Sequence, residues 1–209
     1  MKLLLTSGGL TNDLLISTLK NLVKGNIKTA FIPTAANVEE GDKSWLIKDY
    51  LAFQKLGEID IVDISAIDKK VWLPRLKEAN VIAFGGGNTG HLMNWINKSG
   101  LNNELRSLLK DRVYVGISAG SIILSKRLSA SSEFLYGDEH ENDPPGLGFI
   151  NFNIRPHLNS PFFPKVTEAN LKIVSKKLEG DLYAIDDNSA VLYIDSKIKV
   201  ISEGVWKKY

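Results

Sequence analysis

Short runs of apolar, mostly β-branched residues alternate with longer amphipathic segments through the first half of the chain. The short runs predict strands, and the longer segments, in which apolar residues recur at helical spacing, predict helices. The expected strands are 3–6, 29–33, 59–63, 81–84 and 113–115. The expected helices are 13–24, 44–56, 70–79, 89–98 and 102–110. This alternation is typical of βαβ units, in which helices cover a parallel sheet.

The second half of the chain has a different pattern. Residues 129–151 are mostly polar, and Asp143-Pro-Pro-Gly146 predicts a turn. Beyond them we expect a strand at 153–155, a helix at 166–178 and strands at 182–185, 190–194 and 199–202. The predicted fold is α/β, a doubly wound, mostly parallel sheet with helices on both faces and a C-terminal antiparallel ribbon made by the last three strands. No repeat or linker divides residues 1–209, so we expect one domain.

Composition places the chain among ordinary globular proteins. Of its 209 residues 44% are hydrophobic, and 26 basic residues nearly balance 24 acidic ones. The basic residues form no stripe or arm, so we expect no nucleic-acid partner. No apolar run approaches the roughly 18 residues of a membrane span, and the first residues lack a signal-peptide pattern. We therefore expect a cytoplasmic chain without a membrane partner, either a monomer or a homodimer.

The chain contains no cysteine. This excludes disulfides, thiolate metal ligands and a cysteine nucleophile. Nothing else in the sequence implies a metal or an organic cofactor, so we expect neither.

The segment Gly116-Ile-Ser-Ala-Gly120 has the G-x-S-x-G pattern of a nucleophile elbow. An expected strand precedes it, and residues 121–124 can continue as a buried helix. Small neighbours permit the strained serine backbone of such a turn, which presents the serine Oγ at the N-terminus of a helix. We interpret Ser118 as a nucleophile and the Ala119 N–H as a donor to an oxyanion. The alternative is a plain glycine-bounded turn.

The segment Gly85-Gly-Gly-Asn-Thr-Gly90 directly follows another expected strand. Its glycines let the backbone approach a ligand closely, and Asn88 or Thr89 could cap the next helix. One interpretation is a phosphate cradle at a helix N-terminus, although no P-loop lysine follows and the dinucleotide fingerprint is matched only formally. We prefer the other interpretation, in which the Gly87 N–H completes an oxyanion hole with Ala119.

A serine nucleophile needs a base, and the chain has three histidines. His91 begins a helix, and His140 lies in an acidic segment that resembles a solvated loop. His157 follows an expected strand at the sheet edge where sites form in such folds, so we expect it to be the base. Spacing does not decide which acid orients it. The candidates are Glu133, Asp138, Glu139, Asp186 and Asp187.

The set GGGNTG at 85–90, GISAGS at 116–121 and RPH at 155–157 resembles the serine peptidase family of peptidase E, an aspartyl dipeptidase, and cyanophycinase. The order and the intervals agree over nearly the whole chain. The resemblance implies a fold like that of the class I glutamine amidotransferases, with serine in place of their cysteine.

The resemblance also implies roles for single residues. It assigns the nucleophile to Ser118, the base to His157, the oxyanion donors to Gly87 and Ala119, and the acid to Glu133. The family's acid is an aspartate fifteen residues after the serine, and that interval ends on a glutamate here. Both residue types can orient a base. The pair Asp186-Asp187 is the alternative.

The family is expected to hold an aspartate substrate with an arginine soon after the histidine. The matching stretch, 158–172, contains Lys165 and Lys172 but no arginine. A lysine lacks the bidentate fork of arginine, so aspartate specificity stays open. The candidate substrate-binding residues are Asn88, Arg155 and Lys165.

We therefore expect a serine-type peptidase, similar to a dipeptidase, that hydrolyses a small peptide or aminoacyl substrate through a Ser-His-Glu triad and an acyl-enzyme. One alternative is an esterase of the α/β-hydrolase type, for which the 91 residues after Ser118 leave little room. The other is a binding protein that keeps the scaffold without turnover.

Overall fold

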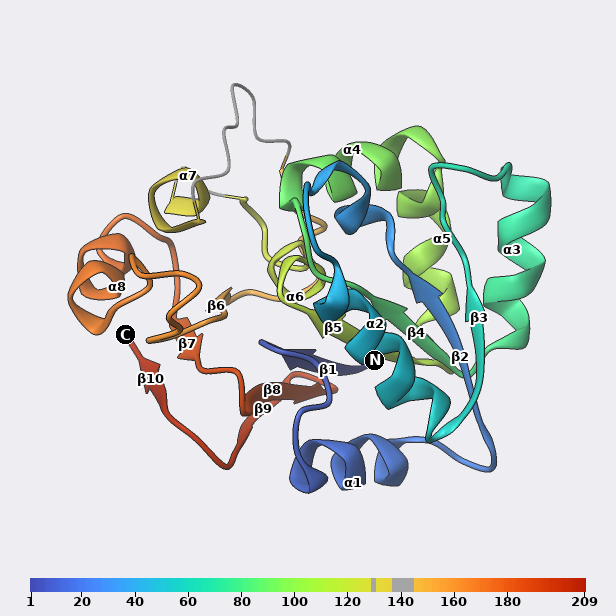
Figure 1. Cartoon of the computed structure of the whole chain (residues 1–209), viewed down its shortest axis with the longest axis horizontal. Coiled ribbons are helices and arrows are strands. Elements are labelled where there is room, and N and C mark those ends of the chain that lie inside the picture. The colour runs from blue at the N-terminus through green and yellow to red at the C-terminus, as the bar shows by residue number, and fades with distance from the viewer. Residues whose placement is uncertain (129–130, 137–144) are drawn as a thin grey trace.

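The computed structural model describes residues 1–128, 131–136 and 145–209, with the backbone alone for 131–133. Seven strands form its central sheet: β1 (Lys2–Thr6), β2 (Ile27–Ile32), β3 (Gly57–Ile61), β4 (Val81–Phe84), β5 (Val113–Ile117), β8 (Ser189–Ile194) and β9 (Lys197–Ser202). Their order is β3-β2-β4-β5-β1-β8-β9 (Figure 1). The first five strands of this order are parallel, and β8 and β9 are antiparallel to their neighbours.

Helices cover both faces of this sheet. One face packs on α3 (Lys69–Glu78), α4 (Thr89–Lys98) and α5 (Leu101–Leu108), and the other on α1 (Asp13–Leu22) and α2 (Ser44–Gln54). Alternate side chains of a strand point to opposite faces. Leu3 and Leu5 of β1 accordingly join the first core, and Leu4 joins the second. The predicted doubly wound α/β fold is therefore confirmed.

A second, three-stranded sheet lies beside the first (Figure 1). Its strands are β6 (Asn153–Arg155), β7 (Leu182–Ile185) and β10 (Trp206–Lys208). The middle strand, β7, is parallel to β6 and antiparallel to β10. Helices α7 (Ser131–Tyr136) and α8 (Glu168–Ser175) contribute side chains to the apolar cluster over this sheet.

The predicted C-terminal ribbon is only partly right. Strands β8 and β9 form it, whereas β7, which we expected in the ribbon, belongs to the small sheet. The reason is burial on both faces of β7. Leu182 and Ala184 join the core under α8, and Tyr183 and Ile185 join a core of the large sheet. Pairing at the exposed edge of the large sheet would leave one of these faces in water.

Some short elements were not expected. Helix α7 lies within the polar stretch 129–151, and a 3-10 helix, η1 (Thr34–Val38), follows β2. The turn predicted at 143–146 lies partly outside the described residues.

The ends of several strands meet at one edge of the large sheet. Thr6 at the end of β1 pairs with Ile117 of β5 and with Ala190 near the start of β8. Phe84 at the end of β4 pairs with Gly116. Because β8 runs in the opposite direction, the residues that precede it lie at the same edge as the residues that follow β1, β4 and β5. The candidate chemistry is concentrated there.

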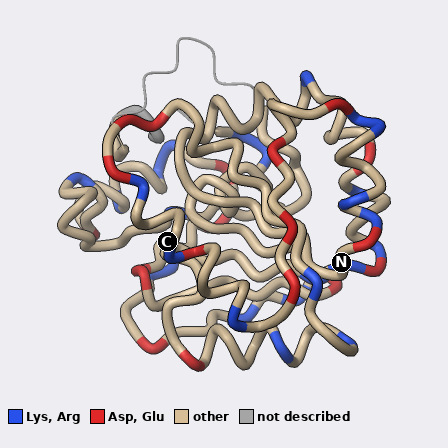
Figure 2. The backbone as a smooth tube through the Cα atoms, turned by 45° about the vertical axis from the view of Figure 1, so that its right-hand side comes forward, with Lys and Arg blue, Asp and Glu red and all other residues tan. Residues whose placement is uncertain are grey.

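The surface of the described chain mixes the two signs of charge. Figure 2 shows Lys and Arg interspersed with Asp and Glu along the tube. None of the helices in the described segments combines the length and the apolar character that a membrane span requires.

Helix α2 buries a carboxyl group against the loop that follows β1. Asp49 is 9% exposed and faces inward with Leu46 and Phe53. A Cβ added to Gly9 would lie 2.6 Å from Asp49 Oδ1. Among the described residues, no hydrogen-bond donor to this carboxyl is found. Burial raises the pKa of Asp49 to about 7, because a charged group without a partner is costly away from water.

Asp49→Asn should stabilise the chain in a pH-dependent way. The folded carboxyl stays protonated up to about pH 7, whereas the ordinary value is 3.8. The wild-type chain therefore loses free energy of unfolding as the pH rises from about 4 to 7. The variant should gain up to about 4 kcal/mol over wild type at pH 8 and little at pH 4. Urea unfolding at both pH values measures the difference.

The exposed carboxylate of Glu78 provides a control. Glu78→Gln should change the difference between pH 4 and pH 8 by less than about 0.5 kcal/mol. Equal destabilisation of Asp49→Asn at both pH values would contradict the raised pKa of Asp49.

Candidate active site

Ser118 lies in a tight turn between β5 and α6 (Ala119–Ile122), with φ 49° and ψ −108°. A non-glycine residue rarely adopts positive φ, and such strain is common at functional positions. Both glycines of the motif are sterically required. A Cβ at Gly116 would lie 2.7 Å from the Gly120 carbonyl, and a Cβ at Gly120 would lie 2.3 Å from the Phe84 carbonyl oxygen. Small residues therefore let the turn pack against the end of β4.

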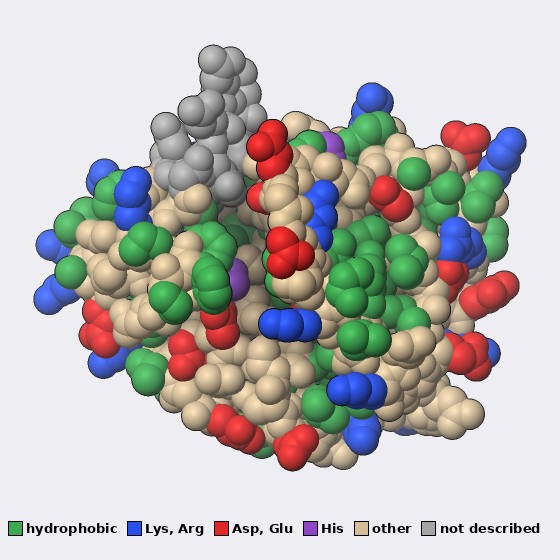
Figure 3. All heavy atoms as spheres, in the orientation of Figure 1, with side chains coloured by type: hydrophobic (Ala, Val, Ile, Leu, Met, Phe, Trp, Pro, Cys, Tyr) green, Lys and Arg blue, Asp and Glu red, His purple; other side chains and the backbone are tan. Residues whose placement is uncertain are grey.

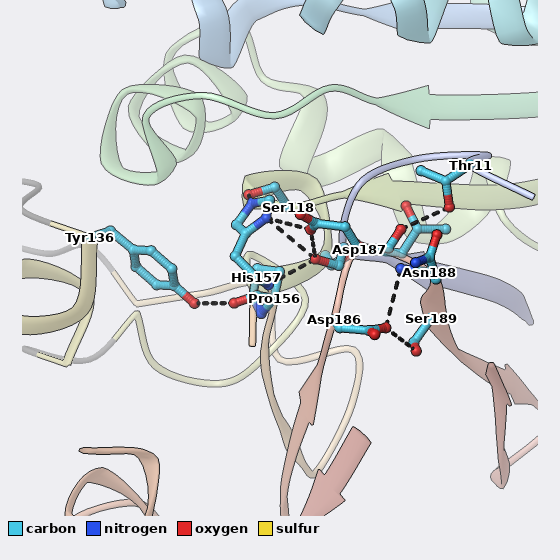
Figure 4. Close-up of polar contacts among 12 residues, drawn as sticks. Thr11, Ser118, Tyr136, Pro156, His157, Asp186, Asp187, Asn188 and Ser189 are labelled. Atoms are coloured by element: carbon cyan, nitrogen blue, oxygen red, sulfur yellow. Dashed lines mark hydrogen bonds and ion pairs between the residues drawn. The ribbon is translucent and has the colours of Figure 1, made fainter. Parts of the chain in front are cut away.

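Three side chains from distant parts of the chain form one hydrogen-bonded series (Figure 4). His157 Nε2 lies 2.8 Å from Ser118 Oγ, and His157 Nδ1 lies 2.7 Å from Asp187 Oδ1. His157 follows β6 of the small sheet, and Asp187 lies between β7 and β8. A hydroxyl, an imidazole and a carboxylate in this order have the geometry of an activated nucleophile.

Asp187 is held as a carboxylate. Burial by itself would raise the pKa of Asp187, but the hydrogen bond and charge of His157 and the hydroxyl of Ser7 hold it below its ordinary value. The Ser7 hydroxyl donates to Asp187 Oδ1 at 2.6 Å. The Asp187 side chain is 41% exposed, whereas that of His157 is 12% exposed. The imidazole is therefore the buried member of the pair.

The acid beside His157 is thus one of the candidates that spacing left open. The resemblance implied Glu133 instead, which lies in α7 and whose side chain is outside the described residues, as are Asp138 and Glu139. The role of Glu133 stays a prediction. In the described part of the chain, Asp187 is the carboxylate that contacts the imidazole.

Asp186, which precedes Asp187 in the chain, has different hydrogen-bond partners. Its Oδ1 accepts hydrogen bonds from the Ser189 hydroxyl at 2.5 Å and from the Asn188 N–H at 3.1 Å, and its Oδ2 accepts from the Val205 N–H at 2.6 Å. Figure 4 shows it directed away from His157. Asp186 therefore shapes the turn that carries Asp187.

Aromatic rings fix the plane of the imidazole. The ring of Phe163 stacks on His157 with centroids 4.3 Å apart and an interplanar angle of 21°. Tyr136 meets His157 edge-on at 6.5 Å, and its hydroxyl donates to the Pro156 carbonyl at 3.1 Å. Sequence reasoning missed Phe163, for which the only signal is its position six residues after the histidine.

The other two histidines do not join this series in the described structure. His91 contacts Trp95 with ring centroids 6.4 Å apart, and its Nε2 is buried without a partner. Burial lowers the pKa of His91, which favours its neutral form. His140 lies outside the described residues.

The glycine loop after β4 lies against the serine turn. A Cβ at Gly86 would lie 3.4 Å from Ser118 Cβ, and Gly87 has a φ of 122° that strongly favours glycine. Among the described residues, no acceptor is found for the N–H groups of Gly87 and Ala119. The role of these two N–H groups as donors to an oxyanion stays a prediction.

The three candidate substrate-binding residues differ in accessibility. Asn88 caps α4, since its side chain accepts a hydrogen bond from the His91 N–H at 2.8 Å. Arg155 is fully buried, and its Nη1 donates to the Ile154 carbonyl at 2.7 Å. This guanidinium has no exposed surface at which to meet a substrate. Lys165 is exposed, with Nζ 6.0 Å from the ring centroid of Phe134.

The surface around this edge of the sheet is hollowed. Figure 3 shows a histidine side chain in a hollow beside apolar side chains. Within the described segments, the His, Asp and Glu side chains form no cluster of three or more that could hold a metal ion.

Comparisons with known proteins find similar sequences and a similar fold. The sequence pattern of Peptidase family S51 matches residues 3–201. Peptidase E of Nostoc sp. (strain PCC 7120) is 28% identical over 149 residues, 70% of this chain and 59% of that protein. Peptidase E of Shewanella oneidensis is 32% identical over 152 residues, 69% of this chain and 59% of that protein. This chain thus spans about three fifths of both relatives.

A solved structure from Listeria monocytogenes EGD-e shares the fold. Its TM-score is 0.80, and the match covers 97% of this chain and 98% of that chain at 23% identity.

Gly120→Ala tests the contact beneath the serine turn. The atoms nearest to the added Cβ belong mainly to the backbone of Phe84, so we expect a loss of about 3 kcal/mol in the free energy of unfolding. Gly25→Ala is the control, because nothing lies within 4 Å of its added Cβ. Its positive φ alone should cost about 1 kcal/mol. Equal losses in urea unfolding would show that the turn relaxes around the methyl group.

Proposed function

Because the chain belongs to peptidase family S51, we propose that it is a serine peptidase that hydrolyses small peptides by acyl transfer through Ser118, His157 and Asp187. The observation that carries the proposal is the hydrogen-bonded series from Ser118 Oγ to His157 Nε2 at 2.8 Å and from His157 Nδ1 to Asp187 Oδ1 at 2.7 Å. The family resemblance seen in the sequence names the same serine and histidine.

In the first step, Ser118 Oγ attacks the peptide carbonyl carbon while its proton passes to His157 Nε2. The imidazole becomes positively charged, and the Asp187 carboxylate stabilises that charge through Nδ1–H. The C–N bond then breaks as the same proton is transferred to the leaving amine. An ester between the substrate acyl group and Ser118 remains.

In the second step, water attacks the ester with His157 again accepting a proton, and Ser118 is released. In both steps the carbonyl oxygen gains negative charge. The N–H groups of Gly87 and Ala119 are the proposed donors to it, because they have no other acceptor among the described residues.

The proposed substrates are dipeptides or aminoacyl amides, as the resemblance to the family of aspartyl dipeptidases implies. The names of the Nostoc and Shewanella relatives say only that those proteins are peptidases. An aspartate substrate would need a cation. Arg155 is fully buried, and Lys165 is exposed but offers a point charge rather than a bidentate fork. The proposal therefore does not include selection for an N-terminal aspartate. The rates of hydrolysis of a panel of dipeptides with varied first residues measure this selectivity directly.

Ser118→Ala should abolish hydrolysis of every substrate that wild type accepts, by about 10⁴-fold or more in kcat/KM. It should also abolish covalent labelling by a fluorophosphonate, with its unfolding curve little changed. The buried Ser121 hydroxyl, which donates to the Thr6 carbonyl at 2.7 Å, provides a control in the same turn. Ser121→Ala should lose stability but keep labelling. Undiminished hydrolysis by Ser118→Ala would reject the mechanism.

Three carboxylate variants test which acid orients the histidine. Asp187→Asn should lower kcat/KM by about 10³–10⁴-fold, because a neutral amide does not stabilise the imidazolium and favours the wrong tautomer. Asp186→Asn and Glu133→Gln should each lower it by less than about tenfold. Steady-state kinetics on one substrate compares the three variants. A larger loss in Glu133→Gln than in Asp187→Asn would return the role to Glu133.

A further inference from the structure

Ser7 directly follows β1, and its hydroxyl contacts both the proposed base and the proposed acid. It is fully buried. Its Oγ accepts a hydrogen bond from the backbone N–H of His157 at 2.8 Å and donates one to Asp187 Oδ1 at 2.6 Å. The same oxygen lies 3.4 Å from His157 Nδ1. A serine hydroxyl has one donor and two acceptor sites, so this hydroxyl joins the two residues directly.

The contact with the His157 backbone holds an unusual conformation. His157 has φ 66°, in the left-handed region that non-glycine residues rarely adopt. Such a backbone persists only where its surroundings determine it. The Ser7 oxygen is the acceptor for the His157 N–H, and the Ser160 N–H donates to the His157 carbonyl at 3.0 Å. Ser7 therefore helps to hold the backbone that directs the imidazole toward Ser118.

The contact with Asp187 fixes the carboxylate. Asp187 Oδ1 accepts from the Ser7 hydroxyl and also lies 2.7 Å from His157 Nδ1, so one oxygen has two partners. The loop after Ser7 adds further contacts. A Cβ at Gly8 would lie 3.0 Å from Asp187 Cβ, and the Thr11 hydroxyl donates to the Asp187 carbonyl at 2.7 Å. The segment that follows β1 thus holds the acid by its side chain and its backbone.

We propose that Ser7 is a positioning residue of the site, which fixes the His157 backbone and the Asp187 carboxylate relative to each other. This inference rests on the proposed function, because the two residues it positions are the proposed base and acid. Ser7 does not contact the reacting atoms. Its effect passes through His157 and Asp187, so it should appear in the rate of the chemical step rather than in substrate binding.

Ser7→Ala removes both hydrogen bonds with little change in volume. We expect kcat to fall by about 10- to 100-fold, because displacement of a catalytic group by about 1 Å costs up to about 100-fold. KM should stay within about twofold of wild type. The low-field NMR proton resonance of the His157–Asp187 hydrogen bond should shift or broaden, and this readout needs no turnover.

Two further variants separate hydrogen bonding from packing. Ser7→Cys keeps a side chain of similar size but bonds weakly, so it should behave as Ser7→Ala does. Thr34→Val is the matched control, because Thr34 is also fully buried and its hydroxyl donates to a carboxylate outside the series, Asp63 Oδ1, at 2.8 Å. It should lower the free energy of unfolding by a similar amount. It should leave kcat within about twofold of wild type and leave the low-field resonance unshifted.

The outcomes are distinct. Unchanged kcat and an unchanged resonance in Ser7→Ala, beside an active wild type, would overturn the role of Ser7 and leave the peptidase proposal standing. Full recovery in Ser7→Cys would also overturn it, because a weakly bonding thiol would then serve as well as the hydroxyl. A wild type without hydrolysis or fluorophosphonate labelling would refute the peptidase proposal, and the NMR comparison would still test Ser7. If Ser7→Ala does not fold, Ser7→Cys carries the same comparison.

Discussion

The end of β1 is the constraint on which the site depends. The Thr6 carbonyl accepts hydrogen bonds from the Ser118 N–H at 3.1 Å and from the Ser121 hydroxyl at 2.7 Å. The next residue, Ser7, bonds to His157 and Asp187. Two consecutive residues therefore hold the turn at Ser118, the backbone of His157 and the carboxylate of Asp187. They can do so because β1 lies in the middle of the sheet, between β5 and β8.

This arrangement places buried polar groups in an apolar setting, where an unpaired donor or acceptor costs about 1–3 kcal/mol. Thr6 and Ser7 are both fully buried, and both hydroxyls have partners, the Thr6 hydroxyl bonding to the Gly116 carbonyl at 2.7 Å. Asp49 differs from them. It is buried against Gly9, in the loop that follows β1, and its pKa is raised because burial is not offset by a hydrogen bond to its carboxyl among the described residues. The bonded hydroxyls of Thr6 and Ser7 avoid this cost, whereas the buried carboxyl of Asp49 makes the stability of the chain sensitive to pH.

Much of the fold could be predicted, because hydrophobic periodicity is local. The alternating strands and helices from β1 to β5 appear within a few residues of the expected positions. Strand β7 could be located but not assigned to its sheet. The pattern of its four residues is equally compatible with a ribbon strand and with a strand between two cores. Only the burial of both its faces in the folded chain places it beside β6. That placement carries Asp187 to the edge where His157 lies.

The sequence by itself determined the residues whose role depends on immediate neighbours. Gly116 and Gly120 flank Ser118 because their turn admits no larger side chain, and the loop at Gly87 follows its strand directly. The tertiary structure alone decided which carboxylate meets the imidazole and which hydroxyl supports both. Asp187 lies 30 residues from His157, and Ser7 lies 150 residues from it. Hydrogen bonds act over about 3 Å in space. A contact between distant segments therefore has no characteristic spacing in the sequence, and the sequence alone does not reveal it.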